Sequence, residues 1–167
     1  QLGLPNARFQ FEIQEAASFK ENGKDQLTWL FTANKGTALE SINKVASGGE
    51  LSRIMLSIKA VMAKYKKLPT LIFDEIDTGV SGEVAQQMAG IMEEMGEQMQ
   101  VFSITHLPQI AARGKQQIKV YKEDIDNVTI TQLKQLSEEE RIVEIGQMIG
   151  GHNLTESAIA HAKQLRN

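Results

Sequence analysis

Residues 71–75 read Leu-Ile-Phe-Asp-Glu, three apolar residues followed by two carboxylates. Pro69 precedes this stretch, so the apolar run is short and sharply bounded. A short, wholly apolar run is typical of a parallel strand that is covered on both faces of its sheet. We therefore predict a central strand at 71–73 that ends in Asp74 and Glu75.

A second apolar strand is predicted at 101–104, where Val-Phe-Ser-Ile is followed by Thr105 and His106. Between the two strands, residues 83–95 carry apolar side chains at spacings of three and four, which predicts a helix. We interpret its methionines as core filler. The order strand, helix, strand predicts a right-handed parallel crossover.

The segment before this unit contains a long helix and a hairpin. From Gly49 to about residue 65 the apolar residues recur at helical spacing, and Ser-Gly-Gly-Glu at 47–50 precedes them. Residues 9–13 alternate between apolar and polar, residues 18–25 are mostly polar, and residues 27–32 are again mostly apolar, which predicts an N-terminal antiparallel hairpin with its turn in the polar tract. Residues 39–46 show no pattern that assigns them.

The segment after His106 is predicted to contain a short helix at 109–113 and a second hairpin formed by 118–121 and 128–133. Two helices close the chain. The first begins at Ser137, where Glu140 three residues later completes a capping box, and the second begins at Thr155.

Composition excludes several classes of protein. The 167 residues are 41% hydrophobic, enough for one domain over 1–167. A net charge of −3 argues against a general electrostatic attraction to nucleic acid, and the absence of cysteine excludes disulfides and Cys-type zinc sites. No apolar run is long enough to cross a bilayer, so we expect a cytoplasmic protein with no membrane partner. Because the chain begins with Gln, we expect it to be a piece of a longer protein.

Three motifs carry possible chemistry, and each has a plain structural alternative. Asp74 at a strand end could hold Mg²⁺ while Glu75 orients and deprotonates a water, or the pair could simply begin a polar loop. The glycines at 48 and 49 could admit a phosphate to a helix N-terminus, or Ser47 could be only a helix cap. His106 could be catalytic or a structural residue at the end of a strand.

The order of these motifs resembles that of the ABC-type ATPases. Within that class the stretch from Ala46 to Ala112 is similar to the SMC-like ATPases of bacterial DNA double-strand break repair. Similar residues at 4–9, 149–151 and 158–162 extend the resemblance over nearly the whole chain. The resemblance implies an α/β fold of the P-loop NTPase-like (ABC/SMC head) type: a C-terminal lobe with a mainly parallel sheet, flanking helices and an N-terminal antiparallel hairpin.

The resemblance also implies a role for each matching residue, with ATP and Mg²⁺ as cofactors. Asp74 matches the Walker B magnesium ligand, Glu75 the catalytic glutamate and His106 the switch histidine that senses the γ-phosphate. The signature that contacts ATP on the opposite head corresponds to Ser47, Gly48, Gly49 and Glu50. The D-loop corresponds to residues 76–82, with Asp77 and Ser81 as candidate nucleotide contacts.

Two positions depart from the common pattern. Ala46 stands where many ABC signatures have Leu, and Ser81 stands where many D-loops have Asp, so Asp77 is the nearer acidic residue that could substitute. These departures suit the SMC-like repair proteins better than transporters, although they leave the contacts to the opposite head less well defined.

The phosphate-binding loop G-x-x-x-x-G-K-[ST] is absent from the 167 residues. We therefore expect the chain to be the C-terminal half of a head and inactive as an ATPase alone. Its expected partners are the N-terminal half of the same head, a second head in a homodimer, and DNA in the full-length protein, at a nucleoid-associated location.

Two other functions are compatible with this sequence. A fragment of an ABC transporter nucleotide-binding domain would share the order of signature and Walker B, although the hairpin and the Pro108-Gln109-Ile110 stretch after the histidine weigh against it. A non-enzymatic interaction module would also fit, if the full protein has no phosphate-binding loop.

Overall fold

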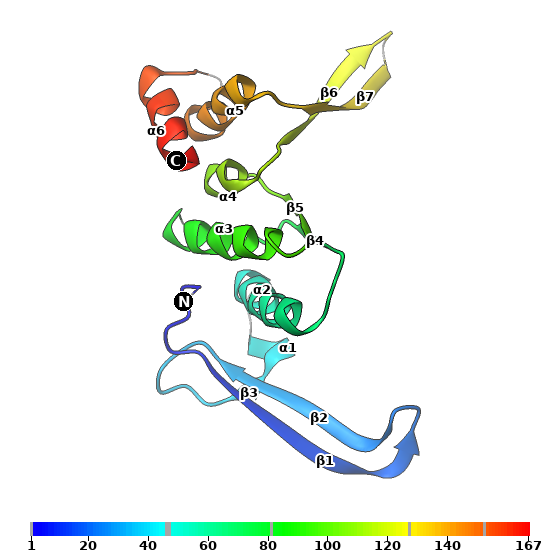
Figure 1. Ribbon diagram of the computed structural model, residues 1–167. Coiled ribbons are helices and arrows are strands. Elements are labelled where there is room, and N and C mark those ends of the chain that lie inside the picture. The colour runs from blue at the N-terminus through cyan, green and yellow to red at the C-terminus, as the bar shows by residue number, and fades with distance from the viewer. Residues whose placement is uncertain (1, 46–47, 81, 127, 152) are drawn as a thin grey trace. The chain divides into compact units, whose positions relative to one another are not determined.

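The computed structural model describes residues 2–45, 48–80, 82–126, 128–151 and 153–167. The chain divides into two compact units, Gln1–Lys59 and Ala60–Asn167. Figure 1 labels their helices and strands. The prediction that 1–167 forms one domain stays a prediction.

The first unit is built on an antiparallel sheet with the order β1-β2-β3. Strand β1 spans Arg8–Lys20, β2 spans Gly23–Thr32 and β3 spans Glu40–Ser41. The predicted hairpin is confirmed, but its strands run to residues 20 and 23, so most of the polar 18–25 tract is strand rather than turn. Gly23 has a φ of 100°, which glycine adopts without a steric cost, and this allows the tight reversal there.

One face of this hairpin is apolar because alternate residues of paired strands share a face. Phe9 pairs with Phe31 and Phe11 with Trp29, and the ring centroids of these pairs lie 5.0 and 5.2 Å apart. Phe31 is fully buried, whereas Phe11 is 57% exposed. The face is therefore packed near β3 and open to solvent further along the hairpin.

The unassigned connector contains the two-residue strand β3 and a single-turn helix, α1, over Ile42–Val45. Helix α2 spans Gly48–Tyr65, as the apolar spacing predicted. Only part of the predicted apolar stripe is buried: Ile54 is 4% exposed, but Met55 and Val61 are 42% and 58% exposed.

The second unit contains the parallel strand pair β4 (Thr70–Asp74) and β5 (Gln100–Ile104), which helix α3 (Gly82–Gly96) connects. The two strands, the helix and the parallel pairing are confirmed. Helix α3 contacts β5 and buries one face, so the interpretation of its methionines as core is also confirmed; the buried residues are Ala85, Met88, Ala89, Met92 and Met95.

The prediction that the strand at 71–73 is covered on both faces is wrong for the described part of this chain. Phe73 is buried, but Ile72 is 67% exposed. On the neighbouring strand, Phe102 is 45% exposed and Ile104 is 56% exposed. The physical reason is that the described residues contribute only two strands to this parallel sheet, and a helix covers only one of its faces.

The rest of the second unit follows the sequence predictions. Helix α4 spans Pro108–Arg113, strands β6 (Ile118–Ile125) and β7 (Val128–Gln135) form an antiparallel hairpin, and helices α5 (Glu138–Gly150) and α6 (Glu156–Arg166) close the chain. Ser137 and Glu140 make the predicted capping box, and Thr155 caps α6. Helices α4, α5 and α6 pack on one another around Ala112, Ile145 and Ala162.

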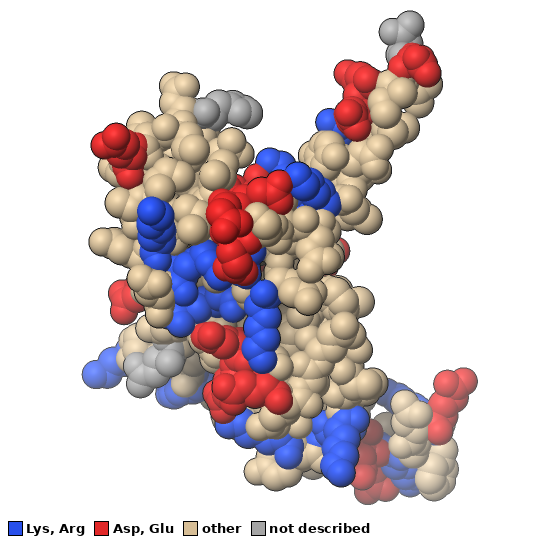
Figure 2. All heavy atoms as spheres, turned by 45° about the horizontal axis from the view of Figure 1, so that its top comes forward, with Lys and Arg blue, Asp and Glu red and all other residues tan. Residues whose placement is uncertain are grey.

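Charged side chains of both signs lie beside one another on the face shown in Figure 2, rather than gathering into one basic surface. This distribution accords with the net charge of −3. Within the described residues, no helix combines the length and the apolar character needed to cross a membrane.

Candidate functional site

The carboxyl ends of β4 and β5 meet at one edge because the strands are parallel and in register, with Asp74 opposite Ile104. The Glu75 backbone N–H donates to the Ile104 carbonyl oxygen at 3.2 Å, which extends the pairing one residue beyond the strand. Asp74, Glu75 and His106 are all exposed. Three of the predicted site residues therefore lie together, with their side chains accessible, at the edge where open α/β sheets bind ligands.

Glu75 has a φ of 47°, a left-handed conformation that is uncommon for a residue with a side chain. Its carbonyl oxygen accepts hydrogen bonds from the Thr78 N–H at 3.4 Å and the Thr78 hydroxyl at 3.0 Å. The Asp77 carbonyl oxygen then accepts from the Val80 N–H at 3.1 Å. The chain thus turns sharply directly after β4, and local hydrogen bonds stabilise that turn.

Asp77 differs from the other carboxylates of the site because its side chain is enclosed. The residue is 1% exposed, and its Oδ2 accepts a hydrogen bond from the Thr105 hydroxyl. The same Oδ2 lies 3.7 Å from Nδ1 of His106, whose side chain is 67% exposed. The structure therefore brings Asp77 together with the residues that follow β5.

The signature residues lie in the first unit. Gly48, Gly49 and Glu50 form the first turn of α2, and the Ser52 hydroxyl donates to the Gly48 carbonyl oxygen at 2.9 Å. Among the described residues, a Cβ built on Gly48 would meet no atom within 4 Å, so the space beside this glycine is open. Ser47 and Ser81, the two remaining predicted contacts, lie outside the described residues.

The residues at the sheet edge suit a magnesium ion that is bound together with a nucleotide, rather than a metal ion enclosed by several protein ligands. Among the described residues no three His, Asp or Glu side chains are grouped to hold a metal ion. Magnesium in nucleotide sites is usually held by one or two carboxylates together with phosphate and water oxygens. The exposed carboxylate of Asp74 at the end of β4 fits that requirement.

One residue at this edge had no role in the sequence predictions. Thr105 links Asp77 to the chain after β5, because its Oγ1 also accepts the Leu107 N–H at 3.0 Å. Its position between a strand end and His106 is the only sequence signal that could have singled it out.

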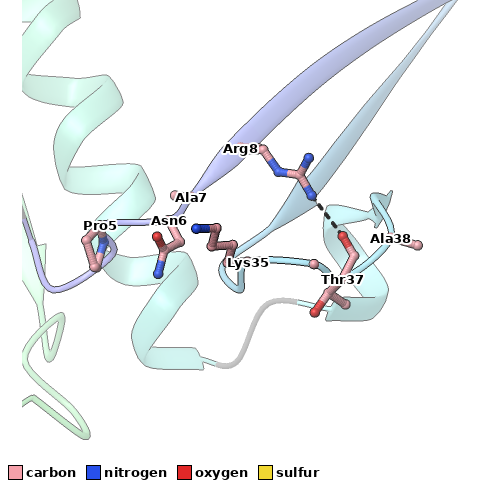
Figure 3. Close-up of a pocket in the computed structure, with 8 residues that line it drawn as sticks. Pro5, Asn6, Ala7, Arg8, Lys35, Thr37 and Ala38 are labelled. Carbon is pink, nitrogen blue, oxygen red and sulfur yellow. Dashed lines mark hydrogen bonds between the residues drawn. The ribbon is translucent and has the colours of Figure 1, made fainter.

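The described part of the first unit also contains a hollow beside the start of β1, between residues 5–8 and 35–38. Figure 3 shows the Arg8 guanidinium reaching the Thr37 carbonyl oxygen, and its Nη2 donates at 2.9 Å. None of the predicted site residues that the structure describes lines this hollow.

No family model matches the chain. Among curated proteins, it is 42% identical over 166 residues to the DNA repair protein RecN of Vibrio cholerae, covering 99% of this chain and 30% of that protein. It is 46% identical over 145 residues to RecN of Bacillus subtilis, covering 87% of this chain and 25% of that protein. The chain thus spans at most about a third of the length of these relatives.

Solved structures with a similar fold include Smc head domains and a structure from work on SMC ATPases. The Smc head domain of Pyrococcus yayanosii, with a coiled coil and joint, has a TM-score of 0.66 at 20% identity, covering 87% of this chain and 26% of that one. A structure from a study of ATP-driven dimerization and DNA stimulated activation of SMC ATPases has a TM-score of 0.61 at 21% identity, covering 90% and 86%. The predicted fold class, a C-terminal lobe of an SMC-like head, is confirmed, and these comparisons give no support to the transporter alternative.

Proposed function

Because the chain belongs to the RecN family of DNA repair proteins, we propose that it forms the C-terminal part of an SMC-like ATPase head that acts in recombinational repair of DNA double-strand breaks. In this proposal the head completes a composite Mg-ATP site when two heads dimerise. The observation that carries the proposal is the meeting of Asp74, Glu75 and His106 at the carboxyl edge of β4 and β5.

Each of these residues has a chemical task that its position allows. Asp74 would hold Mg²⁺, whose charge stabilises the negative charge on the phosphates when it is bound. Glu75 would accept a proton from the attacking water, and His106 would donate a hydrogen bond to a γ-phosphate oxygen. Their exposed side chains are accessible to a nucleotide at this edge.

The signature would act on the nucleotide of the opposite head. Backbone N–H groups at the start of α2, with Gly48 and Gly49 in its first turn, favour an anion through the helix dipole. Ser47, Glu50 and Ser81 are proposed to contribute further polar contacts there. This assignment makes a second copy of the head a required partner.

The phosphate-binding loop would come from the N-terminal half of the same head, since the 167 residues do not contain it. The exposed apolar side chains of Ile72, Phe102 and Ile104 support such a partner, because parallel strands are normally covered on both faces. We further propose that the chain alone is inactive, and that the full-length protein binds DNA in the bacterial cytoplasm, at the nucleoid.

The substitution Glu75→Gln in the full-length protein tests this function. The amide keeps the size of the side chain but cannot accept the proton, so ATP hydrolysis should fall by roughly 10²- to 10⁴-fold. Nucleotide binding, measured by fluorescence titration with labelled ATP, should stay close to that of the unchanged protein. Glu97→Gln, an exposed carboxylate just after α3, is the matched control and should hydrolyse normally. Near-normal turnover in Glu75→Gln would remove Glu75 from the mechanism.

A further inference from the structure

Asp77 is the most enclosed charged residue near the proposed site. Aspartate is rarely buried fully unless it is paired, because moving a carboxylate out of water is costly. At 1% exposure, Asp77 has the Thr105 hydroxyl as a hydrogen-bond donor to Oδ2, and its buried Oδ1 has no hydrogen-bond partner among the described residues. Because the described residues give this carboxylate one hydroxyl donor, its enclosure is better explained by what Asp77 positions than by a stabilising effect alone.

The hydroxyl of Thr105 also connects Asp77 to the start of the next helix, α4. Its oxygen accepts the Leu107 N–H at 3.0 Å, and the Leu107 carbonyl oxygen accepts the Ile110 N–H at 3.1 Å in the first turn of α4. Leu107 is the N-cap of α4, and its own side chain cannot cap the helix. The path from the Asp77 carboxylate to the start of α4 therefore consists of consecutive hydrogen bonds.

His106 lies in the middle of this path, between Thr105 and Leu107. His106 Nδ1 lies 3.7 Å from Asp77 Oδ2, which is too long for a hydrogen bond. The Nδ1 edge of the ring nevertheless lies near the carboxylate. Fixing the backbone on both sides of His106 restricts where its imidazole ring can lie.

We infer that Asp77 is a positioning residue: its carboxylate anchors Thr105, and through Thr105 it holds the 105–107 loop so that His106 is presented at the sheet edge beside Glu75. This role is internal to one head, in place of a contact between Asp77 and the nucleotide of the opposite head. The effect on catalysis rests on the proposed function, whereas the anchoring of the loop does not.

The test uses the full-length protein with three threonine variants. Thr105→Val removes the hydroxyl but keeps the shape, and Thr105→Ser keeps the hydroxyl. Thr70→Val is the matched control, because the Thr70 hydroxyl also bonds across β4 and β5, at 3.1 Å to Gln100 Oε1, but at the opposite end of the strands. Hydrogen exchange over residues 105–113 is measured without nucleotide, and the kcat and KM of ATP hydrolysis are measured separately.

We expect Thr105→Val to speed amide exchange in the 105–113 peptide by about tenfold and to lower kcat by about 10- to 100-fold, with KM nearly unchanged, since a misplaced group slows the chemical step rather than binding. Thr105→Ser should restore both quantities, and Thr70→Val should change neither. Adding Asp77→Ala to Thr105→Val should lower kcat no further, because both substitutions break the same path.

Unchanged exchange in Thr105→Val would overturn the anchoring. If Thr105→Val exchanges faster but keeps the kcat of the unchanged protein, and that protein hydrolyses ATP, the loop does not present His106 for catalysis. The same conclusion follows if the double variant loses kcat by the product of the two single losses. If the unchanged protein hydrolyses no ATP, the proposed function fails, and the exchange comparison alone decides whether Asp77 anchors the loop. The Thr105 variants keep the test decisive if Asp77→Ala does not fold.

Discussion

Replacing Arg141 by methionine should loosen the helices that follow the site. Arg141 is 2% exposed on α5, and its Nη1 donates to the Lys115 carbonyl oxygen at 3.0 Å and to Glu138 Oε1 at 2.8 Å. Its Nη2 donates to the Gly114 carbonyl oxygen. One guanidinium therefore ties the segment just after α4 to α5.

The expected loss can be worked out from these contacts. A hydrogen bond to a charged group contributes about 1.5–3 kcal/mol. Gly114, Lys115 and Glu138 are exposed and can bind water once Arg141 is replaced, and the buried Arg141 Nε has no hydrogen-bond partner among the described residues. Methionine also keeps most of the buried length of the side chain. We therefore expect a net loss of about 2 kcal/mol, roughly one such bond rather than three.

Native-state hydrogen exchange of α5 and α6 measures this loss, because about 2 kcal/mol corresponds to roughly 30-fold faster exchange through local opening. Arg113→Met is the control: Arg113 pairs with Glu93 at 3.4 Å between side chains that are 48% and 44% exposed, so its loss should cost less than about 1 kcal/mol. If the two variants exchange alike, the buried guanidinium does not hold these helices together.

Two further outcomes are expected. The 167-residue chain alone should neither bind Mg-ATP tightly nor hydrolyse it, because it lacks the phosphate-binding loop, and calorimetric detection of micromolar binding with turnover would contradict this. The Lys134 ammonium lowers the pKa of Glu140 by a hydrogen bond at 2.5 Å, so this pair stabilises the fold above the usual Glu pKa of about 4.3 and the effect is lost as pH falls through the lowered value. Glu140→Gln should thus have a lower free energy of unfolding than the unchanged chain at neutral pH but not in acid. Urea unfolding at both pH values measures this, and an equal difference between the two proteins in acid would contradict the prediction.

The regular elements could be predicted because their periodicity is local. The spacing of apolar residues in α2 and α3 and the capping box at Ser137 each lie within a few turns of one helix, and the structure confirms them. The single turn of α1 could not be predicted, since four residues are too few to show a period. Strand residues 18–20 and 23–25 are predicted as turn because both faces of the outer hairpin are largely exposed, which removes the usual alternation of apolar and polar residues.

The candidate site could be predicted only in part for a similar reason. Asp74 and Glu75 lie at the end of one apolar run, and His106 lies two residues after another, so the local sequence predicts their place at the strand ends. The enclosure of Asp77 depends on the left-handed turn at Glu75 and on a hydroxyl 28 positions later in the chain, at Thr105. A contact between two loops has no periodic signal, and without an expected partner Thr105 reads as an ordinary strand-end residue.

The two anchors described above hold the same short helix, which allows one more prediction. Helix α4 has only six residues, fewer than an isolated helix needs to be stable in water. Thr105 fastens the residue before its first turn, and Arg141 binds carbonyl oxygens just after its last. If both ends must be held, losing either one already frees α4, and the double variant Thr105→Val with Arg141→Met should speed its exchange little more than the worse single variant. Effects on the opening free energy that add within about 0.5 kcal/mol would instead mean that the two ends open independently. In that case the 105–107 loop and the C-terminal helices would not be coupled through α4.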